Sequence, residues 1–383
     1  MKFKNLSKRI LAIMLVSSSL LMTCACASVE DEDASGSGSM SGTFLDYSSL
    51  ASDSETIKET EKKTEKKTEK KTEKKTEKVT EKPQVAPTAK TKVPAKSDVD
   101  GTELLNALKG QTSGTTVYSI AVSTTDGIKV AAIKNSDPQN SYSVSKAFCV
   151  TAIGMLYDEG KIKMTDTIGN IFKDEIKKYG INENKWKNIT VHDVLKHKIG
   201  YTKGSLLDID VHASTYKNWD KDYLKLTLSY ETDGKKTYRY SDAAYYLISR
   251  VVAKISGQKL DVYLKSRLFD KADFKNYSIT KCPQGHPIGA TQFFLRPDDM
   301  VKLGRIYLNG GTYNGKRIIS QEWVNMVIDN QYEFGANGTG YSKGGMNGQF
   351  LYINFKHNVA AAWLSKWEDN TWKLGDKLKS YMK

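Results

Sequence analysis

A four-residue repeat in the first hundred residues limits where this chain can build a hydrophobic core. The sequence Thr-Glu-Lys-Lys recurs from Thr60 to Lys82, after an acidic stretch rich in Gly and Ser and before three prolines. Residues 31–96 show no hydrophobic periodicity, so they cannot bury a core. The repeat also disfavours a helix, because it places like charges at i and i+4 and a β-branched Thr in every turn. We therefore predict an extended, solvated tether at residues 28–100 and a folded domain at residues 101–383.

The N-terminus has the pattern of a bacterial export signal. A basic start is followed by an apolar run from Ile10 to Met22, which is short for a transmembrane span, and then by small residues. Because Cys26 resembles the cysteine of a lipoprotein cleavage site, we predict that residues 1–27 are a lipoprotein signal and that Cys26 carries the lipid. This anchor would hold the domain on the extracellular face of the bacterial cell membrane. Cleavage after Ala27 is the alternative, and it would release the protein into the cell wall.

The domain is basic, and its charge points to an anionic partner. Residues 101–383 carry 40 Lys and Arg against 28 Asp and Glu, a net charge of +12. Outside a bacterium the polyanions are teichoic acids, anionic lipids and peptidoglycan carboxylates, so this charge favours a location at the wall. Nucleic acid is the rival partner, but the export signal and the dispersed charge argue against it. We expect a substrate derived from peptidoglycan or teichoic acid, membrane contact through the lipid, and no nucleic acid.

Cysteine and histidine are too sparse to organise the domain. Only Cys149 and Cys282 remain beyond the signal, which excludes a disulfide scaffold. The five histidines lack the tight spacing of metal ligands, and we interpret them as structural or surface residues: His192, His197, His212, His286 and His357. We therefore expect the stability to come from packing, and no metal.

Hydrophobic patterns place strands at both ends of the domain and helices between them. Alternating apolar residues on either side of Asp126-Gly127 predict a hairpin. Later strands are predicted at residues 340–346, 349–355 and 359–364. Helices are predicted at residues 102–109, 143–159, 190–197, 242–255, 260–268 and 298–308 and around Leu374, Leu378 and Tyr381. This order implies an α+β domain whose antiparallel sheet is covered on one face by the N- and C-terminal helices, with an inserted helical region and a catalytic cleft beside it.

The first candidate for chemistry is Ser143 with Lys146. At the start of a helix this spacing puts a hydroxyl and an amine on one face, one turn apart. A partly desolvated lysine gives up its own proton more readily and can then take the proton of the serine. The same spacing recurs in this Lys-rich chain at Ser214/Lys217, Ser256/Lys259, Ser278/Lys281 and Ser380/Lys383. Only Ser143 follows a predicted strand pair and opens a long apolar helix, which favours it as the nucleophile.

Two further candidates lie far along the chain. Tyr240 comes just before the predicted helix at 242–255, where its phenol could project into a cleft and relay a proton. A packing tyrosine is the alternative, since the chain has 21 tyrosines. Lys343 precedes Gly344 and Gly345 on a predicted strand, where glycines allow a substrate backbone to approach and the lysine supplies positive charge.

Taken in order, these three elements resemble the Ser-x-x-Lys, Tyr-x-Asn and Lys-Thr-Gly signatures of serine β-lactamases and penicillin-binding proteins. Other stretches resemble the branch related to class C β-lactamases and esterases: residues 190–201, 240–247, 296–300 and 311–317. The resemblance covers essentially all of residues 101–383 and none of the tether.

The resemblance implies a serine hydrolase with the β-lactamase/transpeptidase-like fold. Ser143 would form an acyl-enzyme, Lys146 and Tyr240 would share the base and acid roles, and Lys343 would orient the substrate and tune Tyr240. The backbone N–H groups of Ser143 and Met346 would form the oxyanion hole, where each donor is typically worth roughly 3–4 kcal/mol. Asp242 and Gly345 would complete the substrate site, and no metal or organic cofactor is implied.

The sequence departs from these signatures at two positions. Asp242 stands where Asn is usual, so it can pair with a lysine instead of donating a hydrogen bond. Gly344 stands where Thr is common, so a hydroxyl that helps to bind a penicillin or a terminal D-alanine carboxylate is missing. We therefore predict a hydrolase of D-alanyl peptides or D-alanyl esters of the cell wall. A β-lactamase and a noncatalytic wall-binding protein of the same fold are the alternatives.

Overall fold

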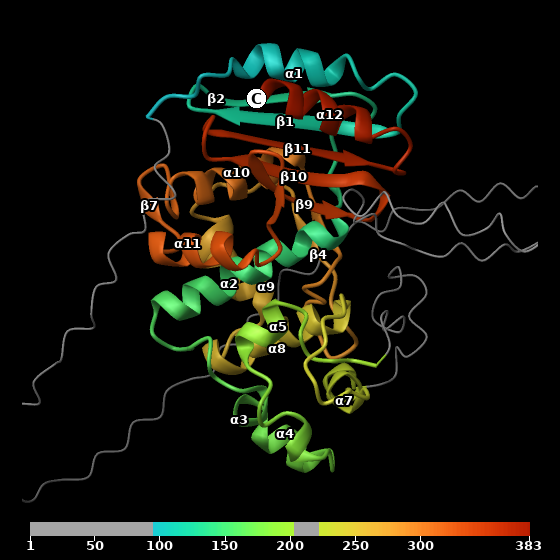
Figure 1. Ribbon diagram of the computed structural model, residues 1–383, viewed down its shortest axis with the longest axis vertical. Helices are drawn as coiled ribbons and strands as arrows, with labels where there is room; N and C mark the ends of the chain where they lie inside the picture. The colour runs from blue at the N-terminus through green and yellow to red at the C-terminus, as the bar shows by residue number, and fades with distance from the viewer. Residues whose placement is uncertain (1–94, 203–221) are drawn as a thin grey trace, which may run out of the picture. The chain divides into compact units, whose positions relative to one another are not determined.

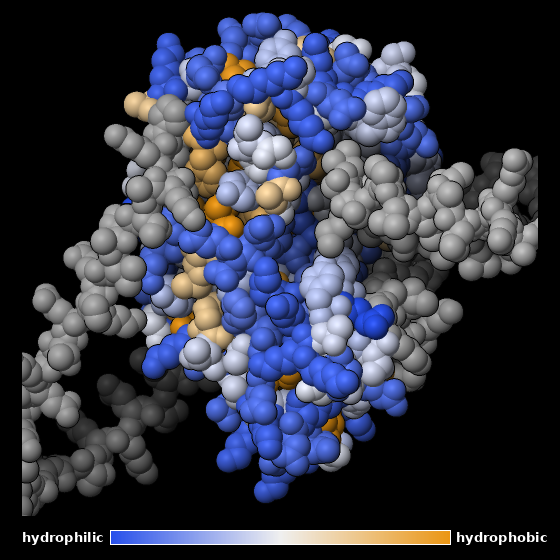
Figure 2. Space-filling view, in the orientation of Figure 1, coloured by the Kyte–Doolittle hydropathy of each residue, from blue (hydrophilic) through white to orange (hydrophobic). Residues whose placement is uncertain are grey.

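The computed structural model describes residues 95–202 and 222–383, and the features below concern those residues (Figure 1). The predicted signal, the predicted lipid site at Cys26 and nearly all of the predicted tether lie outside the described residues. Within them, no helix combines the length and the apolar character that crossing a bilayer requires. The face drawn in Figure 2 is largely hydrophilic, with small hydrophobic areas between the polar residues.

Six strands form one antiparallel sheet in the order β2-β1-β11-β10-β9-β8. The first and last strands of the domain are neighbours, with Ile120 of β1 opposite Trp363 of β11. The predicted hairpin and the three predicted later strands are confirmed. The strands are β1 (Val117–Thr124), β2 (Gly127–Ala132), β3 (Gln139–Asn140), β4 (Ser278–Ile279), β5 (Phe293–Leu295), β6 (Thr312–Tyr313), β7 (Lys316–Arg317), β8 (Gly335–Asn337), β9 (Gly340–Gly345), β10 (Gln349–Asn354) and β11 (Val359–Ser365).

Both terminal helices cover one face of this sheet, as the sequence predicted (Figure 1). Helix α1 (Gly101–Lys109) begins after Asp100, whose carboxylate accepts hydrogen bonds from the N–H groups of Thr102 and Glu103 and caps the helix. Leucines of α1 and of α12 (Trp372–Tyr381) share one core with alternate residues of β1, β10 and β11. Burying each such leucine contributes about 1.5–3 kcal/mol, so this face stabilises the pairing of the two chain ends.

Helix α10 (Pro297–Leu308) packs on the opposite face, against β1, β10 and β11. Its Gly304 allows the close approach, because a β-carbon there would come within 2.9 Å of both Ala360 and Ile353. Ala121 of β1 belongs to this second core, whereas its neighbours Ile120 and Val122 belong to the first. The sheet is therefore buried on both faces, and the second core continues into the helical region.

The inserted helical region is built around α2 (Ser145–Asp158), whose first twelve residues are all buried. Helix α8 (Asp242–Ser256) packs along it and ends at Gly257, which has a φ of 72°. The remaining described helices are α3 (Ile168–Ile171), α4 (Lys173–Lys178), η3 (Glu183–Lys185), α5 (Val191–Leu195), α7 (Tyr223–Ser229), α9 (Leu260–Leu264), the π-turn η5 (Lys265–Phe269), α11 (Gln321–Asn330) and the 3₁₀ turn η6 (Met346–Gly348). The α+β class with an inserted helical region is thus confirmed.

One boundary differs where it matters for chemistry. The helix predicted from Ser143 begins at Ser145, and Ser143 lies on a separate 3₁₀ turn, η2 (Tyr142–Val144). The short strand β3 just before this turn pairs with β5. Ser145 strengthens the junction, because its hydroxyl accepts a hydrogen bond from the N–H of Phe293 at 3.2 Å. The turn carrying Ser143 is therefore held by the helix on one side and by this small sheet on the other.

Candidate active site

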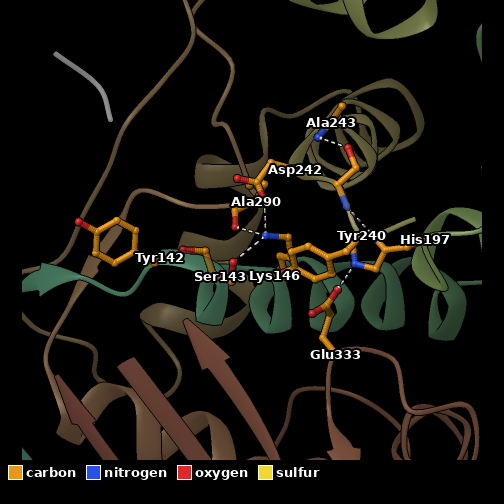
Figure 3. Close-up of polar contacts among 12 residues, drawn as sticks. Tyr142, Ser143, Lys146, His197, Tyr240, Asp242, Ala243, Ala290 and Glu333 are labelled. Atoms are coloured by element: carbon orange, nitrogen blue, oxygen red, sulfur yellow. Dashed lines mark hydrogen bonds and ion pairs between the residues drawn. The ribbon is translucent and has the colours of Figure 1, made fainter. Parts of the chain in front are cut away.

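Ser143 and Lys146 contact each other at the N-terminal end of α2 (Figure 3). The ammonium of Lys146 donates hydrogen bonds to the Ser143 hydroxyl at 3.0 Å and to the carbonyl of Ala290 at 2.9 Å. It also forms an ion pair with the carboxylate of Asp242, the first residue of α8. The Lys146 side chain is fully buried, so these three partners satisfy all of its donors.

The ionisation of Lys146 differs from our expectation. Burial lowers the pKa of Lys146, but the charge of Asp242, reinforced by Tyr240 and Glu333, outweighs burial and raises the pKa above its usual range. The prediction of a readily deprotonated lysine is therefore wrong for this chain. It failed because it counted desolvation alone and did not weigh it against Asp242, although the sequence had indicated that this carboxylate can pair with a lysine. Lys146 is a buried ammonium that holds the Ser143 hydroxyl.

Two ammonium groups lie close to Tyr240. Its position is set by Ser241, the N-cap residue of α8, whose hydroxyl accepts a hydrogen bond from the N–H of Ala243 at 3.1 Å. The Lys343 ammonium donates a hydrogen bond to the Tyr240 hydroxyl at 3.1 Å. The nitrogen of Lys146 lies 4.8 Å from the centre of the same ring.

Lys343 is buried on β9 and pairs with Glu333, which lies in the loop between α11 and β8. Burial lowers the pKa of Lys343, but the charge of Glu333 outweighs it and raises the pKa above the usual value. The pairing with Lys343 also changes the pKa of Glu333. Burial raises the pKa of its carboxyl, whereas Lys343 and His197 together hold that pKa well below its usual range. Both groups are therefore charged.

Sequence reasoning missed Glu333 and the position of His197. The carboxylate of Glu333 contacts the Nε2 atom of His197 at 2.7 Å, and the rings of His197 and Tyr240 lie 4.4 Å apart. His197 is structural, as we interpreted it, but it is packed against Tyr240 inside the site. Nothing about Glu333 distinguished it among the acidic residues. His197 lies within residues 190–201, a stretch that carried part of the family resemblance. This resemblance was the signal that could have placed His197 in the site.

The backbone of Gly345 lies against the turn that carries Ser143. A β-carbon on Gly345 would come 2.7 Å from the carbonyl oxygen of Ser141 and 3.2 Å from the backbone nitrogen of Ser143. A larger residue would displace the turn, so glycine is required here by the chain's own backbone; the predicted approach of a substrate backbone to this strand stays a prediction. Met346 follows at the start of η6 with a half-exposed side chain. The backbone segment proposed to complete an oxyanion hole thus lies beside Ser143.

Tyr142 precedes Ser143 with a φ of 45°, in the left-handed region. Such a conformation costs a residue with a side chain roughly 1–2 kcal/mol. The Tyr142 ring points away from Lys146, and its hydroxyl accepts a hydrogen bond from Asn347 of η6 at 3.1 Å (Figure 3). The strained turn is therefore tied to the same segment that contains Met346.

The structure brings together the residues that the sequence proposed for catalysis and substrate binding, whereas the predicted lipid site at Cys26 lies outside the described residues. Ser143, Lys146, Tyr240 and Lys343 form a connected group, with Gly345 and Met346 at its edge. Asp242 also belongs to the site, but its carboxylate is engaged by Lys146. Among the described residues, no three His, Cys, Asp or Glu side chains are grouped so that they could hold a metal ion. The arrangement offers a hydroxyl nucleophile, a phenol for proton transfer and two ammonium groups.

Comparisons with known proteins identify the family of the chain. A family model described as Beta-lactamase matches residues 112–378. The 6-aminohexanoate-dimer hydrolase of Paenarthrobacter ureafaciens is 24% identical over 201 residues, which are 49% of this chain and 49% of that protein. The N-acetylmuramyl-L-alanine amidase of Bacillus subtilis (strain 168) is 29% identical over 133 residues, 33% of this chain and 29% of that protein. The chain thus spans about half the length of the first relative and less than a third of the second.

Solved structures have the same fold. A putative 6-aminohexanoate-dimer hydrolase from Bacillus anthracis superposes with a TM-score of 0.60 at 14% identity, covering 72% of this chain and 80% of that chain. Further structures of this fold include penicillin-binding protein homologues and a carboxylesterase. At these identities the structural likeness concerns the fold alone.

Proposed function

Because the chain belongs to the beta-lactamase family, we propose that it is a serine hydrolase that forms an acyl-enzyme on Ser143 and releases D-alanyl groups from esters or peptides of the cell wall. The observation that carries this proposal is the 3.0 Å contact between the Lys146 ammonium and the Ser143 hydroxyl, in a site that also contains Tyr240 and Lys343. Hydrolases of amide and ester bonds among the similar proteins support the reaction type.

The proposed reaction has two steps. In the first, Ser143 Oγ attacks the acyl carbon and Tyr240 relays its proton, directly or through Lys146, because an ammonium paired with Asp242 is not itself a base. Tyr240 then returns the proton to the leaving group as the bond to the acyl carbon breaks. In the second step, water attacks the acyl-enzyme and releases the acid, with the same groups moving the proton.

Two positions favour a D-alanyl ester over a carboxylate-bearing substrate. A D-alanyl ester carries an ammonium group next to its reactive carbonyl, and Asp242 adds negative charge near Ser143 where the related proteins carry a neutral amide. A penicillin or a D-alanyl-D-alanine peptide instead carries a carboxylate, and Gly344 lacks the hydroxyl that would help to bind it. Electrostatic complementarity therefore favours the ester.

The proposed location is the outer surface of a bacterial cell. The predicted lipid at Cys26 and the tether at residues 28–100 would hold the domain near the membrane while it reaches into the wall. The net charge of +12 on residues 101–383 would attract teichoic acid chains, which are polyanions. We propose that these polymers, or peptidoglycan, supply the substrate.

The test measures release of free D-alanine from D-alanylated teichoic acid by wild type and by Ser143→Ala. We expect release by the wild type alone. Ser278→Ala is the matched control, because Ser278 begins another Ser-x-x-Lys sequence on the exposed edge of β4. Equal release by wild type and Ser143→Ala would refute the proposal.

A fluorescent penicillin separates the alternatives. Rapid turnover of the label would indicate a β-lactamase, and stable labelling that depends on Ser143 would indicate a penicillin-binding hydrolase. If the protein neither reacts with the label nor hydrolyses D-alanyl or p-nitrophenyl esters, a noncatalytic wall-binding protein is the remaining reading.

A further inference from the structure

The Glu333 carboxylate joins two residues that hold Tyr240 from different sides. One oxygen pairs with the Lys343 ammonium and the other contacts Nε2 of His197 at 2.7 Å. Lys343 in turn donates to the Tyr240 hydroxyl, and the His197 ring packs on the Tyr240 ring at an interplanar angle of 38°. Glu333 itself does not contact the nucleophile. Its effect on the site must pass through these two neighbours.

The hydrogen bonds of His197 define which of its nitrogens carries the proton. Its Nδ1 accepts a hydrogen bond from the backbone N–H of Ser241 at 3.2 Å, so Nδ1 carries no hydrogen. The Nε2–H group must then be the donor to Glu333. Burial lowers the pKa of His197, and this outweighs the opposing effect of Glu333, so the ring is neutral. A neutral ring in this tautomer anchors the N-cap of α8, the residue that follows Tyr240.

The backbone at Glu333 is unusual in a way that aims its side chain into the site. Glu333 has a φ of 60°, and Gln331, the C-cap of α11, has a φ of 52°. Two non-glycine residues in the left-handed region within three positions turn the chain sharply between α11 and β8. A buried carboxylate on a strained backbone is costly for stability, and such arrangements concentrate at functional sites.

We propose that Glu333 is a positioning residue for Tyr240: it holds Lys343 as the ammonium that contacts the phenol, and it fixes the His197 tautomer that anchors the start of α8. This inference rests on the proposed function of Ser143 and Tyr240. Other charged or titratable groups around Glu333 are Lys146 of α2 and Tyr245 of α8, and Asp242 neutralises the first of these. Glu333 is therefore the carboxylate that balances Lys343.

The test compares the pH profiles of wild type and Glu333→Gln with p-nitrophenyl acetate as substrate. Without its counter-ion, the buried Lys343 loses its proton at lower pH, so the alkaline limb of kcat/KM should move down by roughly one pH unit or more. Misplacement of Tyr240 should also lower kcat by up to about 10²-fold. Glu333→Asp keeps the negative charge and should return the alkaline limb of kcat/KM to its wild-type pH. Because the Asp side chain is shorter, kcat should recover only in part.

Two further variants keep the result interpretable. Glu322→Gln is the matched control, because Glu322 accepts a hydrogen bond from Tyr157 at an exposed position and should leave both limb and rate unchanged. If Glu333→Gln does not fold, His197→Gln takes its place. It leaves the pair of Glu333 with Lys343 intact, so kcat should fall while the alkaline limb stays in place.

A spectroscopic measurement tests the contact without relying on activity. In protein with ¹⁵N-labelled histidine, assigned with His197→Gln, the wild-type His197 ring should carry one proton, on Nε2, at pH 7 to 8. A proton on Nδ1, or on both nitrogens, would overturn the inference. So would a folded Glu333→Gln protein with wild-type rate and pH profile. These outcomes differ from a failure of the proposed function. The proposed function fails if the activity of the wild-type protein does not depend on Ser143.

Discussion

Gly345 and Ser143 lie so close that a β-carbon on Gly345 would come within 3.2 Å of the Ser143 backbone nitrogen. The same carbon would meet the carbonyl oxygen of Ser141 at 2.7 Å, and neither contact is with a flexible side chain. A larger residue must therefore push β9 away from the turn that carries the nucleophile. This contact sets the width of the site at the position proposed for the oxyanion hole.

Gly345→Ala should lower kcat/KM for ester hydrolysis by about 10²-fold, because small displacements of reacting groups cost that much. Gly344→Ala is the matched control, since the nearest heavy atom to a β-carbon there is 4.0 Å away. It should retain most of the activity. The measurement is steady-state hydrolysis of p-nitrophenyl acetate, with thermal melting to confirm that both variants fold. Equal activities in the two variants would contradict the prediction.

Asp242→Asn should change the chemistry of Lys146 more than the fold. Removing the carboxylate takes away the main interaction that raises the pKa of Lys146, so burial then lowers that pKa. The lysine becomes able to accept a proton, and the site loses a negative charge that repels carboxylates. We therefore expect faster labelling by fluorescent penicillin and slower release of D-alanine from D-alanyl esters. An increase in both rates, or in neither, would show that Asp242 does not select the substrate.

The parts of the site that local sequence could predict are those set by one turn of helix or one strand. Ser143 and Lys146 meet because the 3₁₀ turn that carries Ser143 runs directly into α2, which keeps the two residues one turn apart. The hairpin at Asp126-Gly127 followed from alternating apolar residues, and the terminal helices followed from their leucine spacing. Each of these features depends on neighbours within a few positions of the chain.

The parts that could not be predicted depend on contacts between distant segments. The sequence indicated that Asp242 can pair with a lysine, but not that its partner is Lys146, which lies 96 positions away. Glu333 reaches Lys343 and His197 only because a loop after α11 lies beside β9 and the end of α5. The left-handed backbone of Tyr142 lacked the usual signal, a glycine. Hydrophobic periodicity predicts which residues are buried, but it does not predict which charged side chains contact each other.

Leu104→Ala should destabilise the protein without changing the site. Leu104 is fully buried between α1 and the face of the sheet that lies away from α10. Its truncation should cost about 2–5 kcal/mol of unfolding free energy, from lost burial and the cavity left behind. Urea unfolding followed by circular dichroism measures this, with Asn106→Ala as an exposed control on the same helix. A loss below about 0.5 kcal/mol, as is usual for surface substitutions, would show that this face does not hold the chain ends together.

Asp299 should make the stability of the protein fall between about pH 4 and pH 6. Burial in the first turn of α10 raises the pKa of Asp299 to about 6, against the opposing effect of Lys302. A carboxyl whose pKa is higher in the folded state binds its proton more tightly when folded, so its contribution is present below pH 3.8 and is lost as the pH rises through about 6. The loss is of order 3 kcal/mol.

Asp299→Asn has no proton to lose, and it should therefore lack this component of the pH dependence. One oxygen of the wild-type carboxylate has no hydrogen-bond partner among the described residues, so the neutral amide forfeits no contact on that side. The variant should consequently equal or exceed wild type in stability at pH 7 and lose its advantage near pH 4. Urea unfolding of both proteins at a series of pH values measures the difference. A constant difference from pH 4 to 7 would mean that Asp299 does not titrate in this window, and that its buried oxygen is solvated or paired in solution.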